Sequence, residues 1–212
     1  LPKPLTSGGC AGRTDTKRGN TDMALHIWDH FWDLRVKECP CDVHFCDWLD
    51  ENNVSDKAIF HFGTGGHHVL GLHNVEKDRK NVILGITASP GEIRTYETMI
   101  VENPELGWGY KAYFGDIYQL DKRLLPMFDI VTLFHVGEFR GPENDAYGAL
   151  TDYEMVKLLV GQTKPGGTVA FYAGSFAYDK GKIEHDRMVE EGLLTPKGQY
   201  KTLPLFERTT KP

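Results

Sequence analysis

The chain has 212 residues, 40% of them hydrophobic, which is enough for a sizeable core in one domain with an appendage or in two small domains. Its formal net charge is −6 and its 24 Lys and Arg residues are scattered, which argues against nucleic acid as the main partner. No apolar run approaches the roughly 20 residues of a membrane helix, and there is no secretory signal pattern, so we expect no membrane partner and a cytoplasmic location.

The first 54 residues divide into two parts. Residues 1–21 form a polar arm, which we expect to dock over the active site or on the second subunit of a homodimer. Residues 22–54 are predicted to form a helical cap. Asp22 can cap a helix that begins near Met23, and a second short helix is predicted over Val43–Glu51. The first helix carries apolar and aromatic residues at helical spacing, namely Leu25, Trp28, Phe31 and Trp32, followed by Arg35.

Four cysteines are present, and three of them lie close together in the sequence. Cys39, Cys41 and Cys46, together with His44, could supply three thiolates and an imidazole to a structural zinc ion. The spacing is wrong for the common zinc knuckles, in which two residues separate the first pair of cysteines. We therefore interpret the group as buried reduced thiols and assign no metal. A disulfide from Cys10 into this group is the alternative in an oxidising compartment.

Strands and helices alternate from residue 55 onward, which predicts a single cofactor-binding domain over residues 55–212. Strands are predicted over Ala58–Phe62, Asn81–Ile86, Tyr110–Phe114, Phe128–Phe134 and Thr168–Tyr172, with one or two closing strands over Gln199–Arg208. Helices are predicted over His67–Glu76, Pro90–Val101, Asp145–Gln162 and Ile183–Leu194. Near-continuous apolar strands separated by helices favour a doubly wound α/β fold, with a mostly parallel sheet covered on both faces.

The residues that directly follow each strand are the candidates for chemistry, because ligands of such sheets bind beyond the carboxyl ends of the strands. The first strand runs into the glycine-rich turn Gly63–Gly66, where missing side chains let a cofactor approach the backbone. Thr87 follows the second strand and Asp116 follows the third. His135 follows the fourth strand.

The order and spacing of these segments resemble class I S-adenosylmethionine-dependent methyltransferases over roughly residues 55–210. The segments that carry the resemblance are Phe62–Gly66, Gly115–Ile117, Phe128–Val131 and Lys164–Thr168. The resemblance implies a Rossmann-like, mostly parallel, seven-stranded sheet with S-adenosylmethionine as the cofactor. It also implies methyl transfer, and the acidic charge balance and the aromatic residues of the helical cap favour a small-molecule acceptor.

By the same resemblance, the residues expected to contact the cofactor are Phe62, Gly63, Thr64, Gly65, Gly66, Thr87, Asp116, Ile117 and His135. Asp116 is expected to accept a hydrogen bond from the adenine amino group, with Ile117 against the ring; the alternative role for Asp116 is a helix N-cap. His135 is expected near the sulfonium as general base, or else as a structural histidine. Trp28, Trp32 and Tyr172 are candidates for the acceptor pocket, with core packing as the alternative.

Two positions depart from the family pattern. His61 stands where an acidic residue usually precedes the glycine-rich turn, and Thr87 stands where an acidic residue usually grips the ribose. Glu92 is close in sequence but would have to reach back from the following helix. These departures motivate a second hypothesis, in which a non-catalytic or repurposed member of the fold acts in binding or assembly. A dinucleotide oxidoreductase is less favoured, because His68 occupies the place of its third glycine.

Overall fold

The computed structural model describes residues 27–211, so the polar arm and the proposed cap Asp22 lie outside the described residues. In chain order the elements are α1 (Cys41–Glu51), β1 (Ala58–Phe62), α2 (Val69–Glu76), β2 (Val82–Thr87), α3 (Pro90–Glu102), α4 (Leu106–Gly109), β3 (Tyr110–Phe114), η1 (Ile117–Gln119), η2 (Lys122–Leu124), β4 (Phe128–Leu133), α5 (Pro142–Asp145), α6 (Asp152–Gly161), β5 (Thr163–Phe171), α7 (Tyr178–Glu190), β6 (Leu194–Tyr200) and β7 (Leu203–Arg208). Among these helices none has the length and apolar character needed to cross a membrane.

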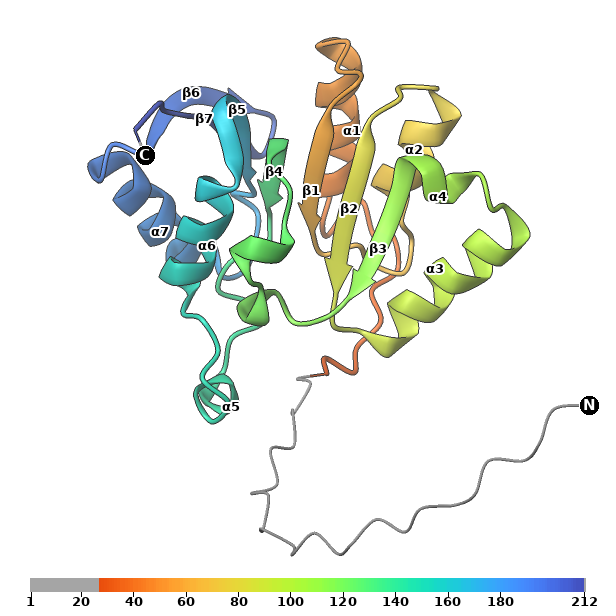
Figure 1. The fold of residues 1–212 in the computed structure, drawn as a ribbon, viewed down its shortest axis with the longest axis horizontal. Coiled ribbons are helices and arrows are strands. Elements are labelled where there is room, and N and C mark those ends of the chain that lie inside the picture. Colours follow the sequence, from red (N-terminus) through yellow and green to blue (C-terminus); the bar gives the residue numbers. More distant parts are fainter. Residues whose placement is uncertain (1–26, 212) are drawn as a thin grey trace, which may run out of the picture.

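The strands form one seven-stranded sheet in the order β3-β2-β1-β4-β5-β7-β6. Strands β1 to β5 pair in parallel, and β7 pairs antiparallel with both β5 and β6. The mostly parallel seven-stranded sheet is therefore confirmed, with an antiparallel pair at its C-terminal end. The arrowheads of β1, β2 and β3 point to the same end of the sheet, where the orange-red segment that precedes α1 also lies (Figure 1).

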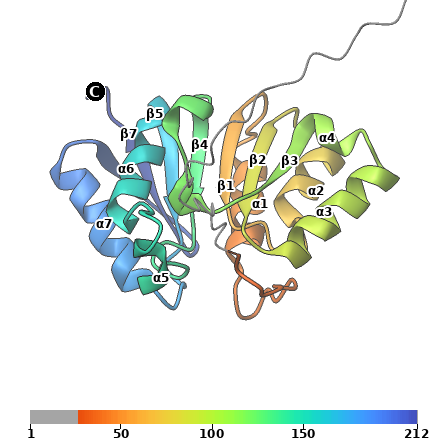
Figure 2. The ribbon, with the colours of Figure 1, turned by 60° about the horizontal axis from the view of Figure 1, so that its bottom comes forward.

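Alternate residues of β1 point to opposite faces of the sheet, as the pleat of a strand requires. Ile59 packs in a buried cluster with residues of α1 and α2, including Phe45 and Leu70. Phe60 belongs to a second cluster with residues of α6 and α7, including Met155. Helices therefore cover both faces, with α1 to α4 grouped on one side of the molecule and α6 and α7 on the other (Figure 2). This is the doubly wound arrangement expected from the sequence.

Residues 27–35 form no helix, so the helix predicted from Met23 is wrong over its described part. The segment instead crosses the carboxyl ends of the strands, and we call residues 27–39 the strap. Its backbone is held by loops of the sheet: Trp28 N donates to Ala88 O across 3.0 Å, and Gly66 N donates to Trp32 O across 2.9 Å. These partners replace the bonds of a helix, because backbone groups need partners of some kind. The second helix of the predicted cap is confirmed as α1.

Two predicted helices have different bounds in the structure. The stretch Asp145–Gln162 divides into the end of α5 and helix α6, because Gly148 has a φ of +70° and Thr151 caps α6 through Glu154 N. The helix predicted over Ile183–Leu194 starts earlier and ends at Glu190, and Gly192 (φ +71°) turns the chain into β6. In both places a left-handed glycine interrupts a hydrophobic pattern that a helix would otherwise continue.

Candidate functional site

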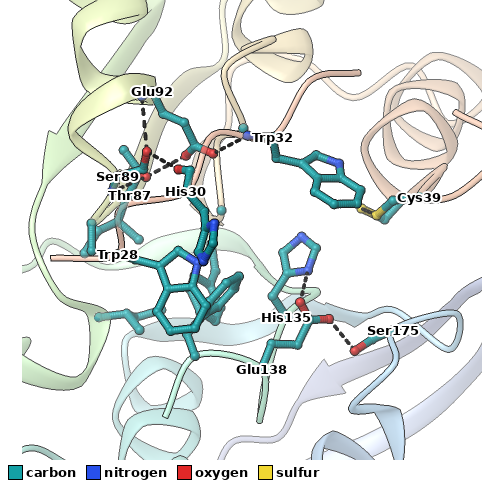
Figure 3. A pocket seen from close by; sticks show the side chains of 18 of the residues that line it. Trp28, His30, Trp32, Cys39, Thr87, Ser89, Glu92, His135, Glu138 and Ser175 are labelled. Atoms are coloured by element: carbon teal, nitrogen blue, oxygen red, sulfur yellow. Dashed lines mark hydrogen bonds and ion pairs between the residues drawn. The ribbon is translucent and has the colours of Figure 1, made fainter. Parts of the chain in front are cut away.

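A cavity of about 540 Å³ lies beyond the carboxyl ends of the parallel strands, within the size range of small-molecule sites. Its walls come from the strap, from α1 and from the residues that follow β1 to β5 (Figure 3). The residues predicted from the sequence that line it are Trp28, Trp32, Phe62, Gly63, Gly65, Thr87, Asp116, Ile117, His135 and Tyr172. The two remaining predicted residues, Thr64 and Gly66, are not among its lining residues.

Three of the four residues of the glycine-rich turn have no side chain, and other rings of the protein lie against them. Gly63 has a φ of +88° and Gly65 a φ of +55°, a region in which only glycine is unstrained. A Cβ atom on Gly63 would lie 2.8 Å from Cδ2 of His135, and one on Gly65 would overlap with the His67 ring. A Cβ atom on Gly66 would overlap with the ring of Phe31 from the strap. The glycines thus allow three aromatic rings to approach the backbone at the edge of the cavity.

A carboxylate stands at the end of β2, although the strand itself ends in Thr87. Ser89 caps α3 by accepting a hydrogen bond from Glu92 N at 3.3 Å, which places Glu92 in the first turn of the helix. The Glu92 side chain turns back, so that Oε2 accepts from the Thr87 hydroxyl at 2.6 Å and Oε1 accepts from Trp32 N at 3.3 Å. Burial raises the pKa of Glu92, and the hydrogen bond from Thr87 opposes that rise. The Glu92 carboxylate therefore does reach back from α3 to the end of β2.

A second carboxylate, that of Asp42, lies beside the glycine-rich turn and comes from α1. His61 on β1 is buried and bonds Thr132 Oγ1 through Nδ1 at 2.8 Å. Its Nε2 lies 3.5 Å from Asp42 Oδ1, while Asp42 Oδ2 lies 3.6 Å from Nε2 of His67. Burial raises the pKa of Asp42 to about 7 and lowers the pKa of His61 to about 3. Sequence reasoning missed Asp42, because no local pattern places the first turn of α1 against β1.

Asp116 is an N-cap and also a wall of the cavity. Its Oδ1 accepts from Tyr118 N at 2.8 Å, which begins η1, so the capping role considered from the sequence is present. Its Oδ2 accepts from the Tyr147 hydroxyl at 2.6 Å. A carboxylate oxygen has more than one lone pair, so each oxygen retains accepting capacity towards the cavity.

His135 is oriented by a chain of hydrogen bonds that starts in the loop after β5. Ser175 Oγ donates to Glu138 Oε1 across 2.5 Å, and Glu138 Oε2 lies 3.2 Å from Nδ1 of His135 (Figure 3). Burial acts to lower the pKa of His135, but the hydrogen bond and charge of Glu138 raise it above its ordinary value. An imidazole that is held by a carboxylate at one nitrogen can exchange a proton at the other. Sequence reasoning gave Glu138 no role as an orienting group.

Cys39, Cys41 and Cys46 are free thiols, two of them buried, and they do not come together with His44. Sγ of Cys39 lies 3.4 Å from Sγ of Cys41, but Cys46 is buried elsewhere on α1 and burial raises its pKa. His44 bonds Thr202 Oγ1 at 2.8 Å, on the side of the molecule near β7. The four-ligand set of Cys39, Cys41, Cys46 and His44 is therefore not formed. The hydrogen bond with Cys41 lowers the pKa of the Cys39 thiol to about 6.

The aromatic residues proposed for an acceptor pocket face the cavity from two sides. Trp28 and Trp32 come from the strap, and Trp28 packs edge-on against Phe139 with ring centroids 5.1 Å apart. Trp32 is 42% exposed, whereas Tyr172 at the end of β5 is buried. Backbone hydrogen bonds hold the strap at Ala88 and Gly66, and its indole rings form a wall over the strand ends.

Comparisons with known proteins identify the fold as that of class I methyltransferases. No family model matches the chain, and no curated protein matches it in sequence. Solved structures do match: a putative caffeoyl-CoA O-methyltransferase from Staphylococcus aureus has a TM-score of 0.57 at 11% identity, covering 87% of this chain and 86% of that one. A putative S-adenosyl-L-methionine-dependent methyltransferase from Methanococcus maripaludis has a TM-score of 0.57 at 10% identity, covering 82% and 88%.

A third similar structure is an O-methyltransferase family protein from Burkholderia thailandensis, with a TM-score of 0.55 at 12% identity over 81% of this chain. This chain spans 57% of the length of that protein and 35% of the length of a coclaurine N-methyltransferase structure. The likeness covers more than four fifths of this chain at very low sequence identity. It therefore establishes the fold, and the chemistry has to be argued from the cavity.

Proposed function

We propose that the protein transfers a methyl group from S-adenosylmethionine to a small-molecule acceptor. The observation that carries the proposal is the pair of carboxylates, Glu92 and Asp42, which helices deliver to the two positions where the strands lack one. Both line the same cavity as Asp116 and the glycine-rich turn. The departures from the family pattern are thus compensated in space by residues from elsewhere in the chain.

The cavity residues fit the parts of S-adenosylmethionine by their chemistry. Glu92 offers carboxylate oxygens for the ribose hydroxyls at the end of β2. Asp116 offers an acceptor for the adenine amino group, and Ile117 beside it offers an apolar contact for the ring. Asp42 offers carboxyl oxygens as acceptors for the amino group of the methionine part, beside Gly63 and Gly65. These roles follow from donor and acceptor types at the strand ends.

Bound S-adenosylmethionine supplies a methyl group on a sulfonium, which an acceptor atom displaces in line. His135 is the residue that would receive the acceptor's proton, because its imidazole lines the cavity and is held by Glu138. The strap excludes water from above the strand ends, which favours orientation of the reactants. The acceptor itself would lie between His135 and the indole rings of Trp28 and Trp32. An enclosed, partly aromatic wall of this kind suits a small, partly apolar molecule.

Calorimetric titration of the full chain with S-adenosylmethionine and with S-adenosylhomocysteine tests the proposal. We expect binding that is lost in Gly65→Val and in Asp116→Ala. The matched control is Gly161→Ala at the end of α6, where a Cβ atom meets no other atom within 4 Å. This variant should bind both ligands like the unaltered protein. No heat with either ligand, from protein that is folded by circular dichroism, would overturn the proposal.

A second candidate function, binding or assembly without catalysis, is favoured by one specific observation. The ring of Phe31 lies over Gly66, and the Tyr147 hydroxyl already donates to Asp116, so the protein's own side chains occupy part of the cofactor's expected place. The variant Phe31→Ala separates the two candidates. Cofactor binding by the unaltered protein supports the enzyme. Failure of both the unaltered protein and Phe31→Ala to bind either ligand supports the second candidate.

A further inference from the structure

Two cysteines and a histidine meet at the wall of the cavity, from segments 94 or more residues apart in sequence. Cys39 is the last residue of the strap, and Cys41 is the first residue of α1. His135 follows β4 on the neighbouring part of the sheet. One potential ligand atom from each of the three lies within 4.8 Å of the others, and the two sulfur atoms are 3.4 Å apart. Pro40 between the cysteines is the N-cap residue of α1, and its ring restricts the backbone at that position.

We propose that Cys39, Cys41 and His135 bind a thiophilic divalent ion of the zinc class, with a fourth coordination position open to the cavity. Two thiolates and an imidazole are the donors that zinc prefers, and three protein ligands with one open position are typical of reactive zinc sites. Two thiolates also balance the charge of a divalent ion, which suits a site as buried as that of Cys41. The proposal concerns a metal and does not depend on the cofactor proposed above.

The surroundings of His135 match those of a metal-binding histidine. Such histidines commonly use one ring nitrogen for the metal and donate the other N–H to a carboxylate, which fixes the tautomer. Here Nδ1 lies 3.2 Å from Glu138 Oε2, and Glu138 is itself held by the Ser175 hydroxyl at 2.5 Å (Figure 3). This leaves Nε2 as the metal ligand.

The distances are close to those of a tetrahedral site. Zn–S bonds of about 2.3 Å at a tetrahedral angle place two thiolate sulfurs about 3.8 Å apart. The observed separation of 3.4 Å requires only a small rotation, which half-buried Cys39 at the end of the strap can make. A disulfide requires a larger change, because its sulfurs must approach to about 2.05 Å. The pair is therefore nearer to the metal-binding geometry than to the oxidised one.

A bound ion would change the role of His135. The same imidazole nitrogen cannot ligate a metal and accept a proton, so the metal-loaded protein would not use His135 as a base. The ion would instead hold a thiol or hydroxyl of a bound molecule at its fourth position and lower the pKa of that group. Binding of the ion is measured without cofactor or acceptor, so its result is separate from that of the cofactor titration.

The test uses the full chain carrying Cys10→Ser, which removes the cysteine outside the described residues. The protein is reduced with a phosphine, treated with a chelator and titrated with Co²⁺ and, in competition with a coloured chelator, with Zn²⁺. We expect one Co²⁺ per chain, a thiolate-to-metal charge-transfer band, and the strong visible absorption of a tetrahedral site. Addition of Zn²⁺ should displace Co²⁺ and protect both thiols from alkylation.

The control is Cys46→Ser, which changes a buried cysteine on the same helix that is outside the cluster. It should keep the stoichiometry and the charge-transfer band. Cys39→Ser should lose the band while its circular dichroism stays unchanged, since Cys39 precedes the helix, and Glu138→Gln should bind the ion more weakly. Absence of stoichiometric binding in the parent protein would overturn the proposal. So would a band that survives in Cys39→Ser, or one that disappears in Cys46→Ser.

Discussion

Glu92 in the first turn of α3 accepts a hydrogen bond from the hydroxyl of Thr87, the last residue of β2, across 2.6 Å. The last position of the strand therefore presents a carboxylate, although its own side chain is neutral. In the family pattern the strand itself ends in an acidic residue, whereas here a residue of the following helix brings the carboxylate to that position. Ser89 makes this possible, because its cap fixes where the helix begins.

Glu92→Gln should weaken binding of S-adenosylhomocysteine by roughly tenfold to a hundredfold, the usual worth of a hydrogen bond to a charged group. The reason is that an amide retains the size of the side chain but loses its charge and one acceptor. Glu97→Gln is the control, because Glu97 lies on the exposed side of the same helix. Calorimetry would measure both variants. Equal affinities for the two variants would show that Glu92 does not contact the ligand.

His61 should make folding stability depend on pH. Burial holds its pKa at about 3 in the folded protein, against about 6.5 in an unfolded chain. Between these values the unfolded chain binds more protons, so the free energy of unfolding decreases as pH falls. From pH 6.5 to pH 5 this contribution is about 2 kcal/mol at most. His61→Gln should remove it, which urea unfolding at several pH values would detect as a flatter dependence.

Other titratable groups near His61 also affect the pH dependence of stability, so the effect of His61 has to be measured by comparing variants. These groups are Asp42 from α1 and the histidines His67, His68 and His135. The raised pKa of Asp42 has the opposite effect. Because this carboxyl binds its proton more tightly in the folded protein than in the unfolded chain, it makes the free energy of unfolding decrease as pH rises. The pH dependence of the free energy of unfolding in the unaltered protein is thus the sum of opposing contributions from His61 and Asp42. Exposed His30 provides the control, and His30→Gln should keep that pH dependence; an identical pH dependence in His61→Gln and His30→Gln would contradict the prediction.

Phe45→Ala should lower the free energy of unfolding by about 3–5 kcal/mol, the usual cost of deleting a buried aromatic ring. Phe45 is fully buried, and it joins α1 to the sheet through contacts with Phe134. Phe176→Ala, at a ring that is 86% exposed, should change stability by less than about 0.5 kcal/mol. Thermal or urea unfolding would measure both. A loss of less than 1 kcal/mol in Phe45→Ala would indicate that α1 is not part of the cooperative fold.

Thr151→Ala should cost about 1 kcal/mol of stability, because it removes one half of a capping box. The Thr151 hydroxyl accepts from Glu154 N at 3.2 Å, and Glu154 Oε2 accepts from Thr151 N at 2.8 Å. Thr151→Ser keeps the hydroxyl and should retain nearly full stability. If the two variants unfold at the same urea concentration, the cap makes no contribution to the stability of α6.

The strands were predictable from the sequence because a strand that is buried on both faces consists of a nearly continuous run of apolar residues. Each of the five predicted parallel strands is present, and Ala58–Phe62 and Tyr110–Phe114 have the predicted bounds. The strap was not predictable in this way. Its aromatic residues fit helical spacing, but its backbone bonds go to Ala88 and Gly66, which are distant in sequence. Tertiary partners of this kind override a local periodicity.

The site was predictable where it consists of residues that end strands. Asp116 and His135 follow their strands and line the cavity as expected. Asp42 and the joining of Cys39 to His135 were not predictable, because each depends on where α1 lies against the sheet. Glu92 was a borderline case, since the pattern Ser89-Pro90-Gly91-Glu92 indicates a cap but not the direction in which the carboxylate turns.

Main-chain hydrogen bonds anchor the strap at Ala88 and Gly66, and they leave the Trp32 side chain 42% exposed. Trp28 and Trp32 attach through N–H and C=O groups that any amino acid other than proline supplies. The Trp32 ring is therefore open to replacement without loss of its backbone attachment, whereas the Trp28 ring also packs against Phe139. If the strap holds the acceptor as proposed, exchange of the side chain at position 32 offers a route to redirect the cavity towards new molecules while the sheet is left untouched.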